Sequence, residues 1–276
     1  GWGGGSGGAS ARVTGLSGTA AGGAANVNGT ATARCADGSG FTQTITTDAN
    51  GSWSGTIANG VLPCALEVTG GTPPVTLHGY ADSAGTVNIT PVTDLVLALA
   101  TSATPADWFA AFDGTTVDVA TATTQLLDAL TTAGFTVPGS GSPFTTAFTP
   151  DGSGWDGLLD DIAQAIADDG SLADYAALVT LIKDGNLGSL PPAPVVETFS
   201  IAGTISGATG SVSWETGVGA TVHHSGSDTD GSVTFTLPAG LESGSNYSVV
   251  VTTPPSGQEC VVTNGSGTLS AAVSNV

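Results

Sequence analysis

The sequence predicts an α+β protein of several domains, in which two small β-sandwiches flank a helical domain. Three observations lead to this prediction: β-rich runs separated by glycines near the start, apolar residues at helical spacing in the middle, and a return of β-rich runs near the end. At 276 residues, the chain is long enough for two or three domains of ordinary size.

The predicted boundaries divide the chain into five segments. They are a glycine-rich tether (1–11), a β-sandwich module (12–89), an α-helical domain (90–186), a proline-rich linker (187–198) and a C-terminal β-sandwich module (199–276). Glycine and serine favour a flexible chain in the tether, whereas consecutive prolines stiffen the linker. We therefore expect folded modules joined by segments of different stiffness.

Each β-module contains one clear turn signal. Asn50-Gly51 separates two runs rich in threonine and apolar residues, as expected of a tight turn between strands. Asp228-Thr-Asp-Gly231 matches Asp48-Ala-Asn-Gly51 at the equivalent place in the second module. The favoured interpretation is that the two modules are copies of one β-unit, and the alternative is independent use of the same turn chemistry.

The helical segment contains several start and stop signals. Thr90-Pro91 and Thr104-Pro105 each place a capping hydroxyl before a proline suited to a first helical turn. Gly134 is placed to end a further helix, and another is expected over 154–169. Ser171 is predicted to cap the last helix.

The charge balance excludes several classes of partner. Three basic residues stand against 23 acidic ones, for a formal net charge of -20. Nucleic acids and anionic membranes attract clustered lysine and arginine, so neither is expected as a partner. The chain also has no apolar run of membrane-spanning length, and we expect no membrane insertion.

The three cysteines indicate an oxidising compartment. Cys35 and Cys64 lie in one predicted β-module, where they form either a disulfide or two buried thiols, and the disulfide is favoured. Cys260 is left over, which suggests either a partner in another chain or a partner lost from this one. We expect the sequence to be the mature form of an exported protein, because it begins without a signal peptide.

Two stretches resemble known bacterial families. Thr47-Asp-Ala-Asn-Gly-Ser-Trp53 resembles the hallmark of carboxypeptidase-regulatory-like, or prealbumin-like, modules of bacterial surface proteins. GTISGATGSV, SNYSVVVTTPPSGQECVVTNGSGT and the closing VSNV resemble a repeat of exported bacterial lipoproteins. The resemblance implies immunoglobulin-like or prealbumin-like sandwiches. It also implies a strand and a cysteine beyond VSNV, which would pair with Cys260.

No motif predicts catalysis, a cofactor or a metal site. His223-His224 could bind a metal with Asp228, but neighbouring strand residues point to opposite faces. Gly4-Gly-Ser6-Gly-Gly8 fits a nucleophile pattern but lacks the strand and helix that the pattern requires. The helical carboxylates Asp156, Asp160 and Asp161 are expected on a solvated face.

The sequence therefore predicts an extracellular structural or adhesive surface protein that is not an enzyme. We expect its subunits to form a homo-oligomer or filament through the N-terminal tail and an open β-edge. The residues predicted to take part in assembly are Gly1, Trp2, Gly3, Cys260 and Val276.

Two other functions remain open at this stage. One is a monomeric cell-surface module that binds a glycan or another protein. That alternative gains support if Trp108 and Trp155 are exposed, and loses support if they are buried. A hydrolase is the remote second alternative, because a family resemblance does not fix activity.

Overall fold

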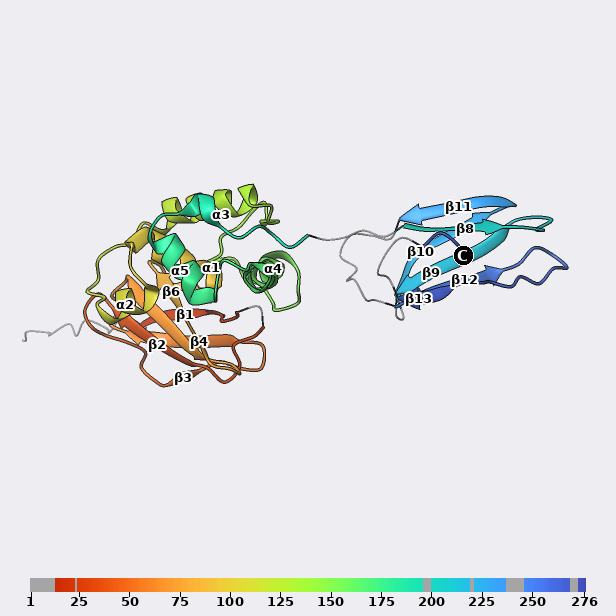
Figure 1. Cartoon of the computed structure of the whole chain (residues 1–276). Helices are drawn as coiled ribbons and strands as arrows, with labels where there is room; N and C mark the ends of the chain where they lie inside the picture. The colour runs from red at the N-terminus through yellow and green to blue at the C-terminus, as the bar shows by residue number, and fades with distance from the viewer. Residues whose placement is uncertain (1–12, 23, 196–199, 219–220, 237–245, 269–272) are drawn as a thin grey trace, which may run out of the picture. The chain divides into compact units, whose positions relative to one another are not determined.

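The computed structural model describes residues 13–22, 24–195, 200–218, 221–236, 246–268 and 273–276. The chain forms two compact units, Gly1–Pro194 and Val195–Val276. Among the described residues, both units contain antiparallel sheets, and the first also contains five α-helices (Figure 1). The mixed α+β class that the sequence predicts is therefore correct.

The first unit contains two sheets. One has the order β4-β1-β7 and the other β3-β2-β5-β6. Their strands are β1 (Val13–Thr19), β2 (Thr30–Cys35), β3 (Ile45–Thr46), β4 (Ser52–Ala58), β5 (Cys64–Gly70), β6 (Val75–Ala81) and β7 (Gly85–Thr86). Buried side chains from both sheets form one core cluster, which includes Leu16, Trp53, Ile57 and Leu66. The two sheets therefore pack face to face, as a sandwich requires.

The sequence of β2 shows why this segment forms a half-buried strand. Threonine and arginine alternate with small apolar residues, and the exposed and buried positions follow the same period of two. Gly51 makes the predicted turn before β4 at a positive φ of 74°. A Cβ atom there would lie 2.1 Å from the Ala20 carbonyl oxygen, so the close approach requires glycine.

A disulfide joins Cys35 to Cys64, as the sequence predicts. The two residues are direct partners in the pairing of β2 with β5, and both are buried. The bond therefore links the ends of two central strands. It is also consistent with a secreted protein, because disulfides persist in oxidising compartments.

Five helices and one short 3₁₀ turn follow the strands of the first unit. They are α1 (Pro91–Thr101), α2 (Pro105–Ala110), α3 (Val119–Thr132), α4 (Gly154–Asp168), α5 (Tyr175–Lys183) and η1 (Leu187–Ser189). Thr90 and Thr104 cap α1 and α2 as predicted. The predicted cap at Ser171 is wrong. Asp174 caps α5, because Ser171 is held in a turn by the Asp169 carboxylate.

Helix α1 occupies the centre of the helical layer. It packs against β6 on one side and against α3 and α5 on others, and its residues from Pro91 to Ala98 are buried (Figure 1). One hydrophobic cluster includes Tyr80 of β6 together with residues of α1, α3, α4 and α5. The segments predicted as a sandwich (12–89) and a helical domain (90–186) therefore lie within one compact unit.

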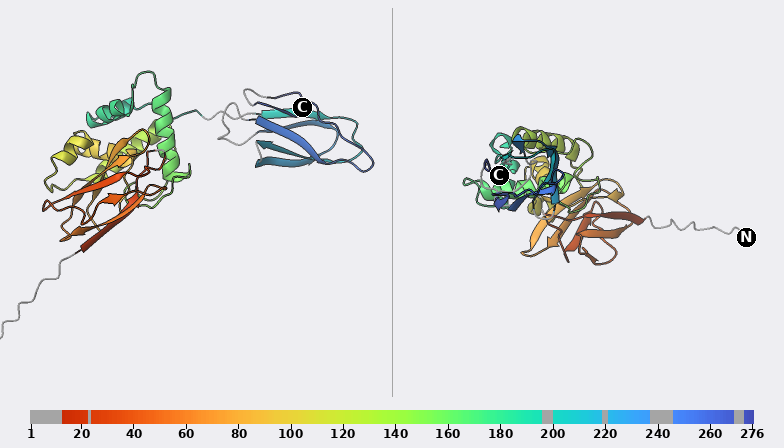
Figure 2. Two further views of the ribbon diagram at one scale, coloured as in Figure 1. Left: turned by 90° about the horizontal axis from the view of Figure 1, so that it is seen from below. Right: turned by 90° about the vertical axis from the view of Figure 1, so that its right-hand side faces the viewer.

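The second unit also contains two sheets. One has the order β10-β9-β12-β13, and the other pairs β11 with β8, as labelled in Figure 1. Figure 2 shows the strands of this unit from two further directions. The strands are β8 (Ser200–Ile205), β9 (Val212–Val218), β10 (Thr221–Asp228), β11 (Gly231–Thr236), β12 (Asn246–Thr253) and β13 (Ser266–Thr268). Residues 273–276 run parallel to β8 and exchange backbone hydrogen bonds with Ala202 and Thr204.

The two units share one strand topology. The order β3-β2-β5-β6 corresponds to β10-β9-β12-β13, and β4-β1-β7 corresponds to β11-β8 followed by 273–276. In both units the first and fourth strands pair antiparallel, and the last segment lies parallel to the first strand. This correspondence supports the predicted duplication of one β-unit.

The disulfide allows a direct test of the first unit. Replacing Cys35 and Cys64 together by serine should lower its unfolding free energy by about 3–4 kcal/mol, the entropic estimate for a loop between residues 29 apart. Urea denaturation followed by tryptophan fluorescence measures the change. Cys260→Ser is the control, since Cys260 is exposed. A loss no larger than that of the control would contradict the stabilising role.

Candidate functional site

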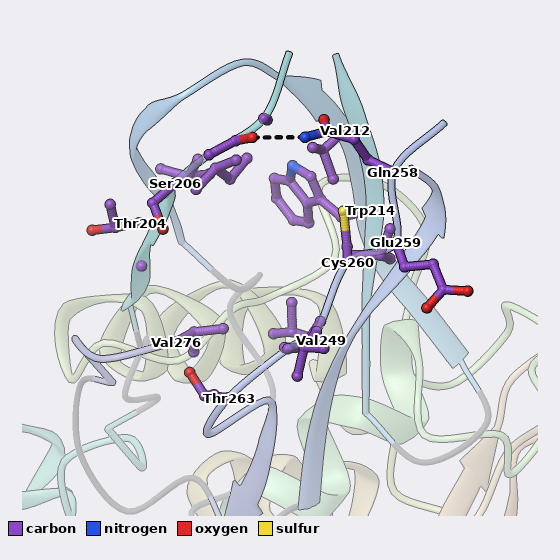
Figure 3. A pocket seen from close by; sticks show the side chains of 18 of the residues that line it. Thr204, Ser206, Val212, Trp214, Val249, Gln258, Glu259, Cys260, Thr263 and Val276 are labelled. Atoms are coloured by element: carbon purple, nitrogen blue, oxygen red, sulfur yellow. Dashed lines mark hydrogen bonds between the residues drawn. The ribbon is translucent and has the colours of Figure 1, made fainter. Parts of the chain in front are cut away.

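A pocket of about 370 Å³ lies between the two sheets of the second unit (Figure 3). Ile201 and Ile205 of β8 line one wall, and Val249 and Val251 of β12 line the facing wall beside Trp214 of β9. The irregular segment from Gln258 to Thr263 forms part of its rim. The interior of this sandwich is therefore open to solvent, with a volume at the lower end of the range for ligand sites.

The length of β13 explains why the pocket is open. In the first unit, β6 pairs with β5 over its full length, from Cys64 to Gly70. In the second unit, β13 pairs only with Asn246–Ser248 of β12. Within the part of the chain that the structure describes, Val250–Thr253 has no strand on its outer side. About half of the β12 edge that corresponds to the edge of β5 covered by β6 therefore has no neighbouring strand among the described residues.

Hydrogen bonds hold the rim in position. The Gln258 amide nitrogen donates to the Gly207 carbonyl oxygen at 2.9 Å, and its amide oxygen accepts from the Thr209 backbone nitrogen at 2.8 Å. The Trp214 indole nitrogen donates to Asp228 at 2.8 Å. These contacts connect Gln258 to the loop between β8 and β9, and β9 to β10.

The structure brings two of the predicted assembly residues to this pocket. Cys260 and Val276 both line it, although 16 residues separate them in sequence. Cys260 is an exposed free thiol, and its sulfur lies on the pocket side near Trp214 (Figure 3). The other predicted assembly residues, Gly1, Trp2 and Gly3, lie outside the described residues.

A second polar site, which sequence reasoning missed, lies inside the first unit. The His78 Nδ1 atom lies 2.8 Å from Asp94, and its Nε2 atom lies 2.9 Å from Glu67. The Tyr175 hydroxyl donates to the other Asp94 oxygen at 2.6 Å. This Glu67–His78–Asp94–Tyr175 network joins β5, β6, α1 and α5. The one sequence signal was a histidine within the apolar strand LHGYA.

The two carboxylates favour the protonated form of His78. Burial by itself lowers the pKa of His78, but hydrogen bonds and charge attraction from Asp94, and then from Glu67, outweigh it. The pKa of His78 therefore lies above its ordinary value of 6.5. Burial, followed by the charge of Asp94, raises the pKa of Tyr175 well above 10, so Tyr175 stays a neutral donor.

The helical carboxylates are less solvated than expected, since Asp160 and Asp161 are half-buried and Asp156 is more deeply enclosed. Asp156 is buried rather than solvated, and one of its oxygens accepts from the Gly152 backbone nitrogen at 2.7 Å. Burial raises the pKa of Asp156 and of Asp160, and neighbouring carboxylates add to the effect. The chain turns back over Asp156 at the start of α4, which a helical pattern alone does not reveal.

Metal chemistry finds no support in the described ranges. Those ranges contain no group of three or more His, Cys, Asp or Glu side chains placed to hold a metal ion. The side chains of His223 and His224 lie outside what the structure describes. No helix among the described residues combines the length and apolar character needed to cross a bilayer.

No family model, curated protein or solved structure matches this chain. The likeness to prealbumin-like modules and lipoprotein repeats therefore stays an expectation from sequence.

The His78 network makes the first unit sensitive to pH. Because folding raises the pKa of His78, its contribution is complete below about pH 6.5 and is lost as the pH rises through the folded-state pKa. The unfolding free energy should therefore fall as the pH rises above about 6.5. Urea titrations across this range measure it.

His78→Asn provides the comparison for this prediction. The variant should lose about 3 kcal/mol at low pH, because two carboxylates then lack their buried partner, and should lack the histidine-dependent fall. Equal pH dependence in both proteins would contradict the role assigned to His78.

Proposed function

We propose that this chain is an extracellular structural or adhesive surface protein whose copies assemble through the open sandwich of the second unit. One observation carries the proposal: among the described residues, Val250–Thr253 of β12 pairs with β9 on one side but has no strand on its outer edge, which lies beside the pocket. Exposed strand edges are sites where another chain adds a strand. Where such a contact joins different surfaces of two copies, its repetition gives a closed ring or an open filament.

Side-chain exposure around the pocket adds to this support. Val261 lines the pocket and is 89% exposed. Burying Val261 and the apolar part of the pocket walls on association is favourable, at about 25 cal/mol per Å² of apolar surface. The pocket is thus a surface at which association releases free energy.

The proposal does not assign an enzymatic activity. His78 has the features of an acid–base group, but it is 2% exposed and both ring nitrogens are hydrogen bonded to carboxylates. A general base needs a nitrogen within reach of a substrate proton. The network instead stabilises the contact between the helical layer and the sheet.

A monomeric glycan- or protein-binding module is the alternative. Exposed tryptophans would favour it, but Trp155 is buried. Trp108 is half-buried and packs against Tyr80 and Phe112, with ring centroids 6.3 and 5.5 Å apart. These two side chains therefore give no support to the alternative.

Blocking the pocket tests the proposal on the folded protein. The purified chain should form oligomers or filaments, seen by light scattering after size exclusion and by negative-stain microscopy. A bulky maleimide on Cys260 should prevent this, because the thiol lies at the pocket, whereas a methylthio group should not. Cys260→Ser treated with the same maleimide is the control. A wild-type chain that stays monomeric at high concentration would overturn the proposal.

A further inference from the structure

We infer that residues 1–12 of a second copy fill the pocket, with Trp2 between its walls and the chain added beside Val250–Thr253 of β12. This inference rests on the proposed function and names the partner segment. The observations behind it are the comparison of the two units, the charge distribution along the chain, and the composition of the segment.

The first unit shows what a filled site looks like. There, β6 lies beside β5 as far as Gly70, and its residue Leu77 is 1% exposed in the sandwich core. In the second unit, the pocket beside Val250–Thr253 of β12 occupies the position at which a side chain equivalent to Leu77 would lie. A segment added here needs one large apolar side chain pointing inward and little bulk elsewhere, because the 258–263 loop lies nearby.

Residues 1–12 have this composition. Trp2 is the one large apolar residue in Gly-Trp-Gly-Gly-Gly-Ser-Gly-Gly-Ala-Ser-Ala-Arg, and the other side chains before Arg12 are small or absent. Twelve extended residues span about 40 Å, which is ample for a strand across a small sandwich. Glycine allows close approach of two backbones but loses more conformational entropy on ordering. Trp2 must therefore supply much of the affinity.

The charge distribution favours residues 1–12 over other segments of a second copy as the occupant of the pocket. The chain has a net charge of -20, so most pairs of its surfaces repel each other. Residues 1–36 contain no Asp or Glu and include Arg12, whereas 195–276 contains six acidic residues and neither Lys nor Arg. Glu259 is exposed at the pocket rim. An N-terminal segment meeting the second unit is thus an attractive pairing.

A peptide of residues 1–12 provides the first test, with the full chain as receptor. The peptide should break up existing oligomers and should slow the reaction of the Cys260 thiol with a disulfide reagent. A Trp2→Ala peptide should bind about thirtyfold more weakly, as expected for truncating a buried aromatic anchor. Equal binding of the two peptides would overturn the inference.

Charge dependence gives a matched pair of receptor variants. Glu259→Gln should weaken binding at low ionic strength, and the difference from wild type should vanish near 1 M salt. Glu215→Gln makes the same charge change on β9, next to Trp214 and therefore on the opposite face of the sheet, and should have no effect. Equal weakening by both variants would show a general charge effect and would contradict the inference.

Cross-linking tests whether the partner is a second copy. Gly3→Cys in the full chain should form a disulfide with Cys260 of another molecule under mild oxidation, giving a ladder on a non-reducing gel. Gln125→Cys on the exposed face of α3 is the control and should give no ladder. Cross-links confined to single chains would overturn the inference. Oligomers of Trp2→Ala as abundant as those of wild type would also overturn it, while leaving assembly itself established.

Discussion

In each unit the sixth strand pairs with the fifth, and the length of this pairing determines whether the space between the two sheets is closed. In the first unit this strand is β6, and it pairs with β5 over seven residues. Its inward side chains complete the core, and His78 on it reaches both β5 and α1. The helical layer packs against the sheet through this strand. Without β6, neither the core nor the contact with α1 would form.

The second unit has the same topology but a shorter strand at this place. Pro254 and Pro255 follow β12 directly, and proline has no backbone N–H to donate to a neighbouring strand. The chain then runs irregularly past Cys260 before β13 pairs over three residues. The open pocket is thus a consequence of where pairing stops. The same strand order therefore encloses a core in the first unit and leaves an open pocket in the second, which the proposed function uses as an interaction surface.

Local signals in the sequence were sufficient for the elements that depend on local chemistry. Thr90 before Pro91 predicts the start of α1, and the shared β-module of Cys35 and Cys64 favours their disulfide. The turn at Gly51 is predicted because only glycine readily adopts its positive φ.

Contacts between residues far apart in the sequence could not be predicted from local signals. Asp94 meets His78 only because α1 folds back over β6, and no spacing rule connects a strand histidine to a helical carboxylate. The 258–263 segment contains Val261 and Val262, which favour strands, yet it is irregular in the structure. The pocket depends on this irregular segment. The sequence therefore indicated an open strand edge but not its position in the second unit.

Hydrogen–deuterium exchange of the full chain at increasing concentration tests the central claim most directly. The account predicts that the amides of Val250–Thr253 that face the open edge, such as that of Val251, exchange fast in dilute solution and become protected as copies associate. The Val250 amide, which faces β9, and the amides of β5 should stay protected throughout. Edge-facing amides whose protection is high and independent of concentration would contradict the account, because the edge would then already be paired within one chain.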